Sequence, residues 1–136
     1  MKNLLLLGAI LFLGGCEVYI FEDPYLDDRN QFLGNYSVEE YSQVTEEFYT
    51  YSMTIKKSCC NSREVKITNF YGVGISVKAI VNNNRLTIPL QLVGGYEIDG
   101  TGKINFNKLE LTYIVRNLYN RPLFTDFVDA EGLLLY

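Results

Sequence analysis

The residues that could carry chemistry are few, and the most unusual are the adjacent cysteines Cys59 and Cys60. Neighbouring residues on a strand face opposite sides, so a disulfide between them requires a distorted turn. The flanking residues 56–63 are typical of a turn, and their cations would make a thiol more reactive. We favour one buried and one half-exposed cysteine at a strand end, because structural buried cysteines are common. A vicinal or redox pair is the alternative.

The remaining candidates argue against catalysis. Asp126, Asp129 and Glu131 could form a glycosidase pair or ligate calcium, but spaced acids of this kind are more often solvated surface. The chain has no His, which excludes a Ser-His-Asp triad and an imidazole zinc site. The glycines of 71–74 and 100–102 lack a following Gly-Lys-Ser/Thr, so we interpret both segments as turns rather than phosphate loops. We expect no enzyme, no metal site and no cofactor.

Aromatic residues are abundant, with 11 Tyr and 8 Phe but no Trp. Exposed tyrosines could form a platform on which sugars stack. We favour core packing instead, because Tyr has a high β propensity and several of these residues share the inward side of a strand. The tyrosines considered for the platform are Tyr49, Tyr51, Tyr71, Tyr96 and Tyr113.

The first sixteen residues have the organisation of a signal peptide. A short positive segment, 1–3, precedes the unbroken apolar run 4–13. As a helix this run would rise only about 15 Å, half of the hydrocarbon core of a bilayer, so it is too short to span a membrane. Its length and position predict a signal-peptide core.

The end of this segment, Leu13-Gly14-Gly15-Cys16, resembles the lipobox of bacterial prolipoproteins. The resemblance implies cleavage before Cys16 and attachment of a diacylglyceryl group to its thiol. Two or three acyl chains anchor a protein stably, at about 0.8 kcal/mol per buried CH₂. We therefore expect an envelope lipoprotein bound to a membrane through Cys16, with the outer membrane favoured. An ordinary secretory signal with an incidental cysteine is the alternative.

The chain beyond residue 32 alternates apolar and polar residues with a period of two. Short segments rich in Gly and Asn separate the runs, so consecutive strands are expected to be antiparallel neighbours. This pattern predicts an all-β antiparallel meander of about eight strands in one domain. The expected organisation is a signal peptide at 1–15, a lipidated Cys16 with an acidic tether to residue 31, and the β domain at 32–136.

A meander of this size can close into a barrel or form a β-sandwich. Pro89 lies inside an otherwise regular run and marks either an edge strand or a bulge. This position favours a partly open barrel or a sandwich over complete closure. The net charge of −4 is opposite to the basic charge that nucleic-acid-binding proteins carry, so we expect no nucleic-acid partner.

Two segments of the β domain resemble lipocalin-like proteins. Phe32-Leu33-Gly34-Asn35-Tyr36 is similar to the opening motif of lipocalins, with Tyr36 in place of the Trp that closes the barrel floor. Arg116 is a candidate for that residue's usual arginine partner. The pattern of residues 98–104 followed by 109–113 resembles small lipocalin-like lipoproteins of Gram-negative envelopes, which are largely uncharacterised. The resemblance implies a calycin-type barrel able to hold a small apolar ligand.

Three hypotheses for the function follow. The first is a module that binds a small, mostly apolar ligand in the barrel interior or serves a structural role. The second is a subunit that interacts with an envelope protein through an exposed apolar patch. A glycan-binding module is the third. The cavity of the first hypothesis would be lined by the inward residues Tyr36, Tyr51, Met53, Ile67, Val77, Ile88, Leu111 and Tyr113.

Overall fold

The computed structural model describes residues 27–119 and 121–136. The signal peptide, Cys16 and most of the predicted tether lie outside the described residues. None of the helices in the described part of the chain is long and apolar enough to cross a membrane.

Eight strands follow one short helix in the described residues, in agreement with the all-β prediction. The 3-10 helix η2 covers Asp28–Phe32. The strands are β1 (Gly34–Ser42), β2 (Glu47–Lys57), β3 (Glu64–Phe70), β4 (Ile75–Asn82), β5 (Arg85–Val93), β6 (Tyr96–Asn105), β7 (Lys108–Asn117) and β8 (Phe124–Leu135).

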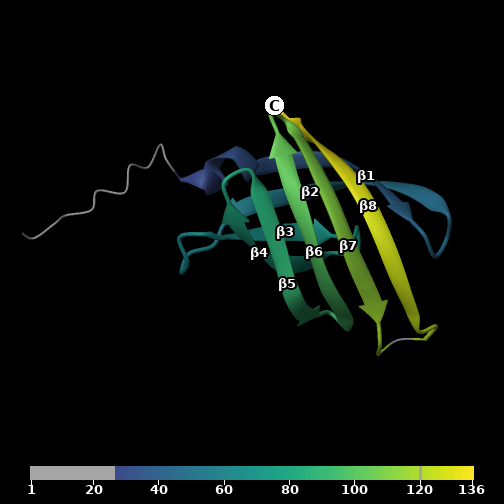
Figure 1. Cartoon of the computed structure of the whole chain (residues 1–136). Helices are drawn as coiled ribbons and strands as arrows, with labels where there is room; N and C mark the ends of the chain where they lie inside the picture. The colour runs from purple at the N-terminus through teal and green to yellow at the C-terminus, as the bar shows by residue number, and fades with distance from the viewer. Residues whose placement is uncertain (1–26, 120) are drawn as a thin grey trace, which may run out of the picture.

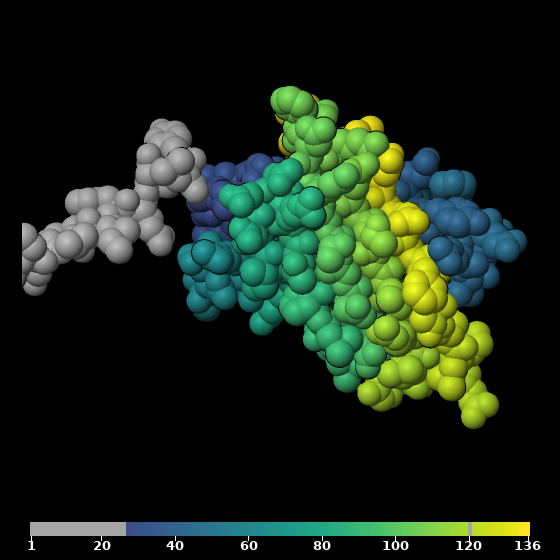
Figure 2. Space-filling model, in the orientation of Figure 1, coloured from purple at the N-terminus to yellow at the C-terminus, as the bar shows by residue number. Residues whose placement is uncertain are grey.

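The strands form a closed barrel in sequence order. Every strand is antiparallel to the next, and β1 pairs with β8 from Asn35↔Leu135 to Ser42↔Val128. In Figure 1, β5 to β8 cross in front of β1 to β4, and Figure 2 shows β8 between β7 and the β1–β2 hairpin. The predicted meander is therefore confirmed, as a barrel rather than a sandwich.

The expectation of incomplete closure at Pro89 is wrong, although the predicted irregularity is present. The pairing of β5 with β6 shifts register between Ile88 and Gln91. On its other side β5 pairs with β4 only over Arg85–Thr87. The Gln91 side chain bridges the remaining gap, because its amide donates to Lys78 O at 2.9 Å and accepts from Lys78 N at 3.0 Å. A side-chain amide thus replaces ladder hydrogen bonds beside a residue that lacks an N–H.

The prediction of a turn at 100–102 is also wrong, because these residues lie inside β6. Gly100 and Gly102 occupy inward positions in the same alternation as Ile98 and Ile104. A Cβ on Gly100 would lie 2.7 Å from Thr112 O and also collide with Tyr113. Glycine is needed here for the close approach of β7, not for a chain reversal.

Inward apolar residues from all eight strands form one hydrophobic cluster. The alternation of buried and exposed residues is clearest in β7 and β8. Burial of this apolar surface is the main force that holds the barrel together.

Helix η2 covers one end of the barrel, which we name the capped end. Gln31 Nε2 donates to Asn83 O at 2.6 Å, and Asp28 Oδ2 accepts from Asn83 N at 3.0 Å. Phe32 is completely buried beneath the helix, and its carbonyl accepts the Tyr36 hydroxyl at 2.8 Å. Residues 28–31, expected to belong to the tether, are therefore part of the fold.

The opposite end carries the turns 43–46, 71–74 and 94–95 and the β7–β8 connection. We name it the pocket end. Because strands alternate in direction, the capped end carries the β2–β3, β4–β5 and β6–β7 turns.

Candidate functional site

The inward alternation becomes polar as β1, β7 and β8 reach the pocket end. In β1, Tyr36 and Val38 are followed on the same side by Glu40 and Ser42, both buried. Asp126 is fully buried at the start of β8. Buried carboxylates are costly unless they are hydrogen-bonded, so their partners define the site.

Glu40 accepts two tyrosine hydroxyls on one carboxylate oxygen. Tyr51 donates to Oε2 at 2.5 Å, and Tyr113 donates to the same atom. Burial raises the pKa of Glu40, while the hydrogen bonds from Tyr113 and Tyr51 act in the opposite direction and the charge of Asp126 adds to the rise. Burial thus disfavours the charged form of Glu40, and the two donated hydrogen bonds favour it.

Asp126 is held by a separate set of donors. Its Oδ2 accepts from Ser42 Oγ at 2.6 Å and from the Tyr71 hydroxyl at 2.8 Å. Its Oδ1 accepts from Val44 N at 3.1 Å, which ties β8 to the β1–β2 turn. Burial is the main cause that raises the pKa of Tyr71, followed by its hydrogen bond to Asp126, so this hydroxyl stays protonated and donating at neutral pH.

Aromatic rings surround the two carboxylates. Tyr113 packs against Phe70 with ring centroids 4.5 Å apart. Tyr71 packs edge-on against Tyr113 and Tyr96, with centroids 6.3 and 6.1 Å apart. These contacts restrain the tyrosines that donate to the carboxylates.

A pocket of about 290 Å³ opens above this network. This is near the lower limit of small-ligand pockets in proteins. The lining contains hydroxyls, tyrosine rings, one carboxylate and no Lys or Arg: Glu40, Ser42, Thr45, Tyr49, Thr50, Tyr51, Tyr71, Gly72 and Val73.

One oxygen of Glu40 remains available to a bound molecule. No described residue donates a hydrogen bond to Glu40 Oε1. In the described part of the chain, every fully buried side-chain oxygen has a hydrogen-bond partner. Because Oε1 has none, it is not fully buried and must reach open space. Because Glu40 lines the pocket while being only 2% exposed, that space is the pocket.

The residues predicted to line an apolar cavity lie on the inward face but belong mostly to the core. Only Tyr51 of the eight lines the pocket. Tyr51 is half-buried and packs against the core cluster. The other seven are buried members of that cluster: Tyr36, Met53, Ile67, Val77, Ile88, Leu111 and Tyr113.

Sequence reasoning missed the acidic part of the site. Asp126 was expected to be solvated surface, and this prediction is wrong, whereas Asp129 and Glu131 are exposed as expected. Glu40 and Ser42 share the strand side of Tyr36 and Val38, so their inward position could have been found by continuing the alternation. Of the tyrosines considered for a sugar platform, Tyr49, Tyr51 and Tyr71 line the pocket.

Arg116 does not contact Tyr36. Its guanidinium pairs with Asp99 Oδ1 at 2.8 Å and Glu97 Oε1 at 3.2 Å, both on β6. The Tyr36 hydroxyl is satisfied by a backbone carbonyl instead. The arginine partner expected for Tyr36 from the resemblance is therefore absent from the described residues, and the Phe32 carbonyl takes its place.

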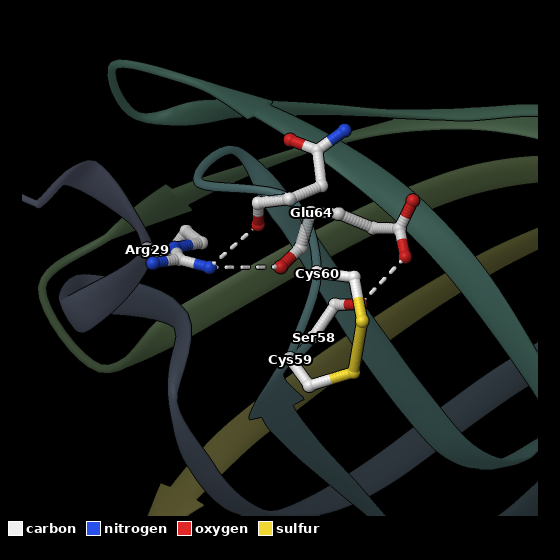
Figure 3. Close-up of a disulfide and its surroundings, with 6 residues drawn as sticks. Arg29, Ser58, Cys59, Cys60 and Glu64 are labelled. Atoms are coloured by element: carbon white, nitrogen blue, oxygen red, sulfur yellow. Dashed lines mark hydrogen bonds between the residues drawn. A yellow bond between two sulfur atoms is a disulfide. The ribbon is translucent and has the colours of Figure 1, made fainter.

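The cysteine pair lies at the capped end, in the β2–β3 turn (Figure 3). Cys59 and Cys60 are joined by a disulfide, and both are exposed. The expectation of one buried cysteine is therefore wrong. The turn is also held by Ser58 Oγ donating to Glu64 Oε1 at 2.7 Å and by Arg29 Nη1 donating to Asn61 O at 2.9 Å.

Comparisons with known proteins give a fold and no family. No protein-family model and no curated protein sequence matches the chain. One solved structure, described as a redesigned beta barrel, aligns with a TM-score of 0.58 and 8% sequence identity, over 81% of this chain and 96% of that one. Among the described residues, no group of three or more His, Cys, Asp or Glu could hold a metal ion. The chain is an eight-stranded antiparallel barrel, consistent with a lipocalin-like barrel.

Proposed function

We propose that the chain is a lipid-anchored, non-enzymatic binding protein of the bacterial cell envelope that takes up a small ligand at the pocket end of its barrel. The observation that carries the proposal is the pocket above Glu40, in which hydroxyl groups, a carboxylate oxygen and tyrosine rings converge. A few convergent polar groups in an otherwise apolar concavity are typical of small-ligand sites.

The position of the anchor is compatible with this role. The lipobox-like segment ending at Cys16 precedes the described residues, and the chain enters the barrel at Asp27 beside the capped end. An anchor joined to the capped end would leave the pocket end away from the membrane. Mass spectrometry of the mature N-terminus tests the anchor: a diacylglyceryl-modified Cys16 is expected, and an unmodified Cys16 would overturn the localisation.

A fragment screen by ligand-detected NMR tests the binding function without presuming the ligand. We expect small aromatic and polar fragments to bind the wild type and to lose binding in a Val73→Trp variant, whose ring would occupy part of the pocket. Val73 is exposed in the turn that lines the pocket, so this variant should fold. Ser62→Trp, in an exposed turn at the capped end, is the matched control. Absence of binding, or equal loss in both variants, would refute the proposal.

An interaction with an envelope protein is the second candidate. The outer side of β8 exposes Phe127, Leu133 and Leu135, each about half exposed. Leu133 and Leu135 are successive outward residues, and Asp129 and Glu131 separate them from Phe127. Neighbouring exposed apolar side chains are typical of contact surfaces. We expect cross-linking at these positions to capture one stoichiometric partner if this role is correct, and Leu133→Glu to abolish the capture.

A further inference from the structure

In residues 27–119 and 121–136, no basic group is bonded to the two buried acids of the site. Glu40 and Asp126 are both buried, and the groups that the structure shows bonded to them are hydroxyls and one backbone N–H. Arg116, near the pocket end of β7, is already paired with Glu97 and Asp99. A buried carboxylate without a cationic partner depends on its hydrogen-bond donors, takes up a proton or binds a cation.

The mouth of the pocket is acidic as well. Tyr49 lines the pocket, and its hydroxyl donates to Glu47 Oε2 at 3.1 Å. Glu46 precedes Glu47 in the exposed β1–β2 turn. Acidic groups around a concave site attract cations and repel anions before contact is made.

The walls suit a flat apolar body. Tyr49, Tyr51 and Tyr71 contribute rings to the lining, and an added Cβ on Gly72 would come within 3.1 Å of the Tyr51 ring. Because Gly72 lacks that atom, the turn can approach Tyr51 closely and form one wall. Tyrosine rings favour both stacked aromatic groups and organic cations.

We infer that the pocket end binds a compact organic cation, a protonated amine on an aromatic or apolar body, with the ammonium group donating to Glu40 Oε1. This inference rests on the proposed function and specifies its ligand class. The unpartnered oxygen of a nearly buried carboxylate marks where the ammonium would lie, and the tyrosine rings would contact the body.

Calorimetric titration of the full chain with three matched probes at neutral pH tests the charge requirement. The probes are phenethylamine, 2-phenylethanol and phenylacetate, which share a ring and differ in charge. Hydrogen bonds to charged groups predict that phenethylamine binds about tenfold or more tightly than 2-phenylethanol, and that phenylacetate binds least. Equal affinity for phenethylamine and 2-phenylethanol would overturn the inference.

Two variants test whether the preference for the amine depends on the charge of Glu40. Glu40→Gln keeps the shape and removes the charge, so the preference for the amine should fall to about twofold or less. Glu39→Gln, the adjacent residue on the outward face, should keep it. Retention of the preference in Glu40→Gln would place the amine elsewhere and refute the inference.

The two proposals fail in different ways. If 2-phenylethanol or other neutral fragments bind and Val73→Trp blocks them, the pocket is a binding site but the cationic ligand class is wrong. If no probe or fragment binds the wild type, both proposals are wrong.

Discussion

Tyr36 at the capped end and Tyr113 at the pocket end are both almost completely buried, yet their hydroxyls have different partners. Tyr36 donates to the neutral carbonyl of Phe32, whereas Tyr113 donates to the carboxylate of Glu40. The capped end is thus closed by apolar packing and a neutral hydrogen bond. The pocket end places two acids where the same strand alternation would normally bury aliphatic side chains.

Within one barrel, the residues that complete the core thus lie apart from those that line the proposed binding pocket. Phe32, Tyr36 and their neighbours complete the core at the capped end. Glu40 and Asp126 contribute little apolar burial and carry desolvation costs, which are offset by hydroxyl donors. A natural barrel keeps such residues where function requires them, so the cost itself supports a binding role at the pocket end.

Truncation of a side chain should affect stability far more at the capped end than at the pocket end, and this is the largest effect that we expect. Phe32→Ala removes a fully buried ring beneath η2 and should lower the free energy of unfolding by about 3–5 kcal/mol. Val73→Ala at the pocket end removes part of a side chain that is 45% exposed and should change it by no more than about 0.5 kcal/mol. Urea denaturation of both variants measures the contrast, and equal losses would refute the division of roles.

Removal of the two tyrosine hydroxyls should reveal the charge of the partner. Tyr36→Phe and Tyr113→Phe should each cost about 1–3 kcal/mol near neutral pH, because each leaves a buried acceptor short of a donor. The hydrogen bond from Tyr113 lowers the pKa of Glu40, so its loss should cost less as the pH falls and Glu40 is protonated.

Tyr36 itself supplies the control for this pH dependence. Burial raises the pKa of Tyr36 to about 12, and its acceptor does not titrate. The cost of Tyr36→Phe should therefore stay constant between about pH 4 and 8. Parallel pH profiles for the two variants would contradict the assigned partners.

Glu40→Gln should flatten the pH dependence of stability. The pKa of Glu40 is raised in the folded state, so its contribution to stability is present below its ordinary pKa of 4.5 and is lost as the pH rises through the raised value. The variant should gain stability relative to the wild type over that window, by about 1.4 kcal/mol for each unit of pKa difference. Thermal melts of the wild type, Glu40→Gln and the outward control Glu39→Gln measure this gain. A difference that is independent of pH would contradict it.

Removal of the cysteine pair should have the smallest effect on stability. Cys59 and Cys60 are adjacent and exposed, so their disulfide closes almost no loop and restricts the unfolded chain very little. The double variant Cys59→Ser, Cys60→Ser should unfold within about 0.5 kcal/mol of the wild type. The hydrogen bonds of Ser58 and Arg29 keep the turn in place. A loss of more than about 1 kcal/mol would mean that the pair stabilises the capped end.

Local patterns were sufficient to predict the strands and the meander, because alternation and turn residues act between neighbours in sequence. The position of Gly100 could not be interpreted in this way. Its role depends on how closely the paired strand β7 lies beside β6, and glycine is equally common in turns. Closure across Pro89 also depends on a residue of another strand, since the Gln91 side chain bonds to Lys78 of β4 in place of ladder bonds.

The site was harder to predict because it also depends on contacts between strands that are distant in sequence. Tyr49, Tyr51 and Tyr71 were among five tyrosines considered for a sugar platform, and core packing was preferred for them. The acids beside them come from β1 and β8. Glu40 lies in the predicted inward alternation, yet a charged residue at such a position is usually read as the end of a strand. Only the three-dimensional pairing of β1 with β2 and β8 brings Glu40, Tyr51 and Asp126 to one end.

A titration of the full chain with phenethylamine, followed through backbone amide NMR signals, tests the central claim most directly. The account predicts saturable shifts at pocket-end residues such as Thr45, Thr50 and Gly72, with the signals of Asn30 and Gly34 at the capped end unchanged. The absence of saturable shifts at the pocket end, or shifts confined to the capped end, would contradict it.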